Sequence, residues 1–103
     1  MRRLILASLL VAAPAFASGD VAWKQGMAQA TRACLKASAL QDAASAGEPV
    51  LFSDAAGKTA LLVTGRWRPA HMKNARATIL CLYDRRSRTA ETQEAPRWSV
   101  ARR

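Results

Sequence analysis

Basic and aromatic side chains gather in one stretch of the sequence, residues 65–76. Guanidinium groups bind carboxylates and phosphates through paired N–H donors, and an indole ring can stack on another ring or a base. The stretch therefore predicts a binding surface, or else a solvated cationic surface without a ligand. The candidate binding residues are Arg66, Trp67, Arg68, His71, Lys73, Asn74 and Arg76.

Catalytic and metal-binding patterns are much weaker. His71 is the only histidine, and general-base chemistry needs a nucleophile or a second titrating group beside it. The acidic residues are scattered without a spacing that pairs them. His71 and Met72 together with Met27 form only a weak set for a soft metal such as Cu(I). We therefore expect a non-enzymatic protein with no metal and no cofactor.

Two cysteines, Cys34 and Cys81, are the only ones in the chain. In an oxidising compartment such a pair predicts one disulfide, whereas two buried thiols are the alternative. The two residues do not form a Cys-x-x-Cys redox motif, and with one histidine they make a poor zinc site. We expect a structural disulfide.

The N-terminal residues have the pattern of a secretory signal. Arg2 and Arg3 precede an apolar run over 4–16, and Ala15 and Ala17 supply the small residues of a cleavage site. The run is shorter than the roughly 20 residues that span a bilayer, although an uncut membrane anchor is the alternative. We predict a signal peptide over 1–17, a domain over 18–96 and a basic tail over 97–103, in a periplasmic or secreted protein.

The positive charge is local. The chain carries 16 basic and 7 acidic residues, a formal net charge of +9. Segment 58–88 contains eight of the basic residues and only one acidic residue, Asp84. If 69–75 joins two antiparallel strands, Arg66, Arg68 and Arg76 lie at one end of the pair and 85–88 at the other. The sequence therefore predicts two separate basic ends and not one continuous groove, and nucleic acid is not an expected partner.

One helix and several strands must position these residues. Alanine-rich residues 21–38 have helical spacing with Cys34 on the buried stripe, Asp20 as N-cap and an extension possible to 45. Gly47 and Pro49 end any helix. Strands are predicted over 49–53, 58–68, 76–84 and 89–94, separated by turns and loops at 54–57, 69–74 and 85–88.

This order predicts an α+β fold, in which one N-terminal helix packs on a three- to four-stranded antiparallel meander. The disulfide would tie the helix to the third strand. Strand alternation then points Ile79, Cys81 and Tyr83 toward the helix and Leu80 and Leu82 away from it. These leucines predict either a cover formed by the C-terminal tail around Trp98 or a surface for a partner.

The middle of the chain resembles small exported proteins of Gram-negative bacteria. The resemblance covers about residues 23–95, including a cysteine after a helix, and rests on Gly65-Arg66, His71-Met72-Lys73-Asn74 and Leu80-Cys81-Leu82-Tyr83-Asp84-Arg85-Arg86. It implies one secreted domain without an established activity, so it assigns no catalytic residue. The order of elements is also similar to PepSY-type and other small periplasmic inhibitor or binding modules, as a likeness of fold alone.

Three functions follow as hypotheses. The first is a protein-binding or inhibitor-like module, whose discriminating sign is an exposed apolar patch that includes Leu80, Leu82 or Trp98. The second is a binder of an anionic envelope polymer, such as lipopolysaccharide or another phosphate-bearing ligand, with salt-dependent affinity. The third is a small metal or redox protein.

Overall fold

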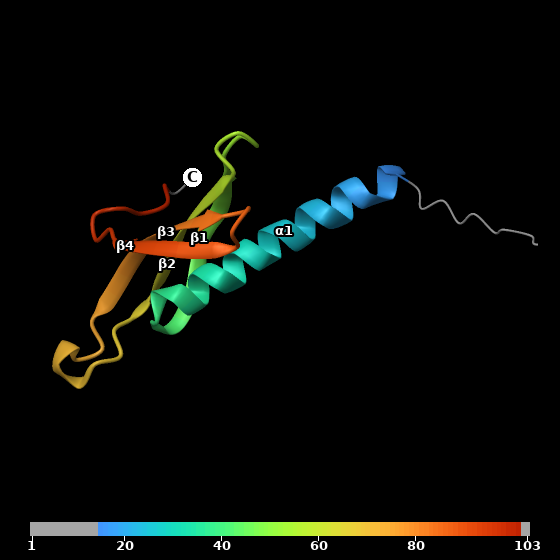
Figure 1. The fold of residues 1–103 in the computed structure, drawn as a ribbon. Helices are drawn as coiled ribbons and strands as arrows, with labels where there is room; N and C mark the ends of the chain where they lie inside the picture. The colour runs from blue at the N-terminus through green and yellow to red at the C-terminus, as the bar shows by residue number, and fades with distance from the viewer. Residues whose placement is uncertain (1–14, 102–103) are drawn as a thin grey trace, which may run out of the picture.

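A computed structural model describes residues 15–101, with side chains from residue 19 onward. The elements are a helix α1 (Ala15–Ser38), strands β1 (Gln41–Leu51) and β2 (Lys58–Arg66), a short 3-10 helix η1 (Ala70–Met72), and strands β3 (Arg76–Asp84) and β4 (Thr89–Glu94). The strands form one antiparallel sheet in the order β1-β2-β3-β4, and α1 packs on one of its faces (Figure 1). The predicted α+β meander with one N-terminal helix is confirmed.

Helix α1 begins earlier than predicted. Asp20 lies within the helix and is not its N-cap, because alanine-rich residues before it continue the helical backbone back to Ala15. The N-terminal half of α1 projects past the sheet (Figure 1), and Trp23 there is exposed. Most of the predicted signal peptide, residues 1–14, lies outside the described residues, so cleavage after Ala17 stays a prediction.

The helix ends sharply after Ser38. Ala39 adopts a left-handed conformation with φ of 57°, and its N–H donates to the carbonyl of Lys36. Non-glycine residues adopt this conformation at a cost, but it closes a helix by satisfying one of the last free carbonyls. The possible extension of the helix to residue 45 is therefore wrong.

Strand β1 occupies much of that segment. Ala44 pairs with Thr64 and Ala46 with Leu62, so the first strand starts at Gln41 and not at residue 49. Alanine favours helices in isolation, but backbone pairing with β2 outweighs that preference here. The pairing brings the backbones of β1 and β2 very close at Gly65, since a Cβ on this residue would lie only 2.7 Å from the carbonyl oxygen of Gln41.

The remaining strands agree with the prediction. β3 and β4 have the predicted bounds, and β2 ends at Arg66, two residues before the predicted end. β2 and β3 pair in continuous register from Lys58 opposite Asp84 to Arg66 opposite Arg76. The basic residues at 66–76 and at 85–88 therefore lie at opposite ends of β3, as predicted.

The core lies between α1 and the facing side of the sheet. Cys34 of α1 and Cys81 of β3 form a disulfide, and both residues are 0% exposed. Ile79 and Tyr83 are buried beside Cys81, whereas the intervening residues of β3 point to the other face. The predicted disulfide and the predicted faces of β3 are confirmed, and such a bond is typical of proteins from oxidising compartments.

Within residues 15–101, no helix combines the length and the apolar character that a membrane crossing requires.

Candidate functional site

The predicted basic loop forms the exposed tip of the β2–β3 hairpin. After Pro69 the chain makes one turn of 3-10 helix, η1, and then two left-handed residues, Lys73 and Asn74. The N–H of Ala75 donates to the carbonyl of Met72, which closes the turn. His71, Lys73 and Asn74 are all exposed. The structure therefore keeps these candidates together, on a solvated turn.

Trp67 does not share that exposure. The inward-facing residues of β2, such as Leu61 and Val63, are buried under α1, and Trp67 lies two positions beyond Gly65 on the same alternation. Its half-buried side chain packs against the core cluster. Part of the ring therefore belongs to the core, and stacking of the indole on a ligand ring stays a prediction.

Arg68 also has a structural role. Its guanidinium donates to the carbonyl of Ala39 at 3.1 Å and to that of Leu40 at 3.3 Å. These carbonyls follow the end of α1, where cations and donors are favourable. Arg68 therefore fastens the hairpin to the α1–β1 connection.

Arg66 and Arg76 are placed differently. They lie directly opposite each other at the end of β2 and β3, and both are exposed. Arg66 donates one N–H to the carbonyl of Asn74 at 3.0 Å, which orients its guanidinium along the turn. Of the predicted binding residues, this pair is the one that the strand register holds together on a single face of the sheet.

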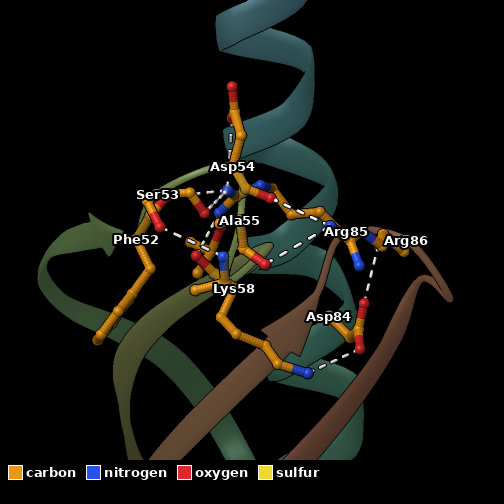
Figure 2. Close-up of polar contacts among 10 residues, drawn as sticks. Phe52, Ser53, Asp54, Ala55, Lys58, Asp84, Arg85 and Arg86 are labelled. Carbon is orange, nitrogen blue, oxygen red and sulfur yellow. Dashed lines mark hydrogen bonds and ion pairs between the residues drawn. The ribbon is translucent and has the colours of Figure 1, made fainter.

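The second basic end, at residues 85–88, ties loops together. The Arg85 guanidinium donates to the carbonyl of Lys58, to Thr59 Oγ1 at 3.1 Å, and to the carbonyls of Phe52 and Ser53 at 2.9 and 3.0 Å (Figure 2). It therefore joins the β3–β4 turn to the β1–β2 connection.

Asp84 balances part of this charge. Its carboxylate lies 2.7 Å from Lys58 Nζ and accepts the N–H groups of Arg86 and Ser87 (Figure 2). The hydrogen bond from Lys58, followed by the two backbone donors, lowers the pKa of Asp84 to about 2. The charged form of Asp84 is thus part of the folded structure.

The face of the sheet opposite α1 carries an apolar groove. Alternation places Leu62 of β2 directly opposite Leu80 of β3 on this outer face, and Ala60 opposite Leu82. The C-terminal tail, residues 97–101, returns across the same face (Figure 1). The groove has a volume of about 350 Å³, and its large apolar lining residues are Val50, Phe52, Leu62, Leu80, Trp98 and Val100.

The tail covers this face only in part. Val100 packs against Gly47, where an added Cβ would lie 2.8 Å from Val100 Cγ2. Trp98, however, remains 57% exposed and Leu82 38% exposed. Of the described residues that line the groove, only Glu48 is ionisable. The expected cover of Leu80 and Leu82 by the tail is therefore only partial, since the tail forms one wall of a surface that stays open, and use of that surface by a partner stays a prediction.

Only some of the residues that line this groove could be predicted from the sequence. The spacing of Leu80, Leu82 and Trp98 was the signal that identified one wall. Val50 and Phe52 both lie in the strand predicted over 49–53, but no face was assigned to them; in the structure Val50 is in β1 and Phe52 follows its last residue. Two apolar residues that flank Leu51 at alternate positions are the signal for an outward-facing apolar edge strand.

The outer face presents an open apolar surface on which few charged side chains lie. Within residues 15–101 no three His, Cys, Asp or Glu side chains lie close enough together to hold a metal ion. Both sulfurs belong to a disulfide without solvent exposure. An open apolar surface with few charges is, by contrast, the usual composition of the centre of a protein interface.

Comparisons with known proteins add no assignment, and the resemblance to small exported proteins stays a prediction. No family model, no curated protein and no solved structure matches this chain.

Proposed function

We propose that this chain is a non-enzymatic binding module of the periplasm or the extracellular space, and that it holds an apolar segment of a partner protein on the outer face of its sheet. The observation that carries the proposal is the groove between β1–β3 and the tail. Exposed contiguous apolar surface is costly in water and marks interaction sites on small domains.

The breadth of the surface favours a protein ligand. Its apolar residues are spread over three strands and the tail, and several of them remain about half exposed. A small molecule is usually buried over most of its surface in an enclosed pocket, which this open face does not supply. Aromatic anchors such as Trp98 and Phe52 are typical of the residues that dominate protein–protein affinity.

A second candidate is a phosphate-bearing envelope polymer bound at the β2–β3 hairpin tip. His71, Lys73 and Arg76 are exposed there, and 69–75 contains no acidic residue. This candidate has less support, because Arg68 at the same end of the hairpin is occupied by the backbone carbonyls of Ala39 and Leu40. A metal or redox function has the least support, since the disulfide is buried beneath α1.

Site-specific photo-crosslinking in exporting cells tests the proposal. A matched pair is available, because Leu82 on the outer face and Leu51 on the opposite side of β1 are each 38% exposed. A benzophenone side chain at Leu82 should give a discrete protein adduct, whereas the same group at Leu51 should not. The adduct should disappear when Val50→Asp is added. Equal adducts from both positions, or adducts only from His71, would overturn the proposal.

A further inference from the structure

The outer face of β2 and β3 changes from apolar to positively charged toward the tip of the hairpin. Five cross-strand pairs lie on this face: Lys58 with Asp84, Ala60 with Leu82, Leu62 with Leu80, Thr64 with Thr78 and Arg66 with Arg76. The first pair is an ion pair that neutralises itself. Ala60, Leu62 and Leu80 line the groove and Leu82 lies beside them, the threonines follow, and the arginines end the series. Arg66 lies four positions beyond Leu62 along β2, a distance of about 13 Å.

The arginine pair is an unneutralised charge on this face. Like charges directly opposite each other in an antiparallel pair destabilise a sheet. Within residues 15–101 neither Arg66 nor Arg76 forms an ion pair with an acidic side chain. Arg66 uses one N–H on the carbonyl of Asn74, and a guanidinium has five donors. An anion placed between the two side chains would relieve their repulsion and meet donors already in position.

We infer that the segment held in the groove is acidic as well as apolar, with an Asp or Glu side chain about four residues from its apolar anchor in an extended conformation. This inference rests on the proposed function and adds the class of partner sequence. The carboxylate of the segment binds between Arg66 and Arg76 while its apolar side chain occupies the groove at Leu62 and Leu80.

Charge also sets the direction of the segment. Glu48 lies in the lining of the groove on β1, level with the apolar floor of β2. It repels an acidic side chain from that floor, whereas the arginine pair attracts one at the hairpin end. At the other end Lys58 is already paired with Asp84. The acidic group of the segment therefore lies beyond the apolar anchor toward the hairpin tip, and a segment with these two groups in the reverse order binds more weakly.

Selection from a displayed library of random 12-residue peptides tests the inference with the full exported chain as the target. Peptides retained by the wild type should combine an aromatic or aliphatic residue with Asp or Glu three to five positions away. The variant Arg66→Gln/Arg76→Gln should retain apolar peptides without the acidic preference. For a peptide selected on the wild type, the same variant should weaken binding about tenfold, because the two exposed charge pairs with the carboxylate are lost.

A matched control removes the same charge elsewhere. Arg32→Gln/Lys36→Gln changes two exposed basic residues of α1 and should leave both the selection and the affinity unchanged. Apolar enrichment without an acidic preference on the wild type would overturn this inference and leave the proposed function standing. No peptide enrichment at all, together with salt-dependent binding to phosphatidylglycerol vesicles, would overturn both.

Discussion

Replacement of Arg85 by lysine separates a structural arginine from a ligand-binding one. Arg85→Lys keeps the positive charge but removes the planar fork that reaches two connections at once. The guanidinium donates to the carbonyl of Lys58, to Thr59 Oγ1 and to the carbonyls of Phe52 and Ser53. A single ammonium group cannot occupy all of these positions.

The size of the expected destabilisation depends on which hydrogen-bond acceptors of Arg85 are left without a partner. Thr59 is 1% exposed, so its hydroxyl has no water to replace Arg85, whereas the carbonyls of Phe52 and Ser53 lie at an exposed turn. A hydrogen bond to a charged group contributes about 1.5–3 kcal/mol when its partner is left buried and unsatisfied. The exposed bonds add little, because water takes their place. Arg85→Lys should therefore lower the free energy of unfolding by about 2 kcal/mol.

Equilibrium urea unfolding followed by circular dichroism measures this change, and the neighbouring residue supplies the control. Arg86 is exposed and contacts the carbonyls of Asp54 and Ala55 only at 3.4 and 3.5 Å. Arg86→Lys should therefore change the free energy of unfolding by less than about 0.5 kcal/mol. Equal effects of the two substitutions, or no effect of Arg85→Lys, would refute the assignment of Arg85 to the fold.

Three further predictions concern stability. Replacement of both cysteines, Cys34→Ala/Cys81→Ala, should lower the free energy of unfolding by about 4 kcal/mol, because the bond closes a loop with a sequence separation of 47, and an unchanged urea midpoint would contradict this. Ala39→Gly should raise the free energy of unfolding by about 0.5–1 kcal/mol, and the melting temperature with it, because the φ of 57° at Ala39 is less costly for glycine. Ala37→Gly within α1 should lower the melting temperature. The pKa of Asp84 is about 2 against an ordinary 3.8, so its charged form stabilises the fold above pH 3.8 and that contribution is lost as the pH falls toward 2. The stability gap between wild type and Asp84→Asn should accordingly close over that range, and a gap independent of pH would show that the Asp84 carboxylate does not stabilise the fold through its charge.

Much of the sheet could be predicted from the sequence because its signals are local. The run around Cys81 is rich in β-branched and aromatic residues and bounded by turn residues, and β3 has the predicted bounds. The presence of just two cysteines predicted the disulfide, and its link to the helix predicted the buried face of β3. Alternation then assigned Leu80 and Leu82 to the outer face without any structure.

Strand β1 could not be predicted in the same way. Residues 41–46 are mostly alanine and small polar residues, which favour a helix or a loop when considered alone. Their extended conformation depends on Ala39 ending the helix and on pairing with β2, which is a tertiary effect. The lining residues Ala46, Gly47 and Glu48 of the groove belong to this unpredicted part of β1, so the sequence does not place them in the candidate site.

The roles of the arginines could not be predicted either. Spacing placed Arg66, Arg68 and Arg76 at one end of a hairpin, and the structure confirms that placement. Spacing cannot show that Arg68 and Arg85 donate to backbone carbonyls, because those carbonyls lie 27 or more residues away in sequence. Charge count alone therefore overstated the number of cations available to a ligand.

Amide chemical-shift mapping is the most direct measurement of the central claim, that the outer face of the sheet is the binding surface. A peptide selected on the wild-type chain would be titrated into the ¹⁵N-labelled protein. We predict that the largest shifts fall on Leu62, Leu80 and Val100, with smaller shifts at Arg66 and Arg76 and none on the exposed side of α1. Shifts concentrated on α1, or on the turn around His71 with the outer face unperturbed, would contradict the claim.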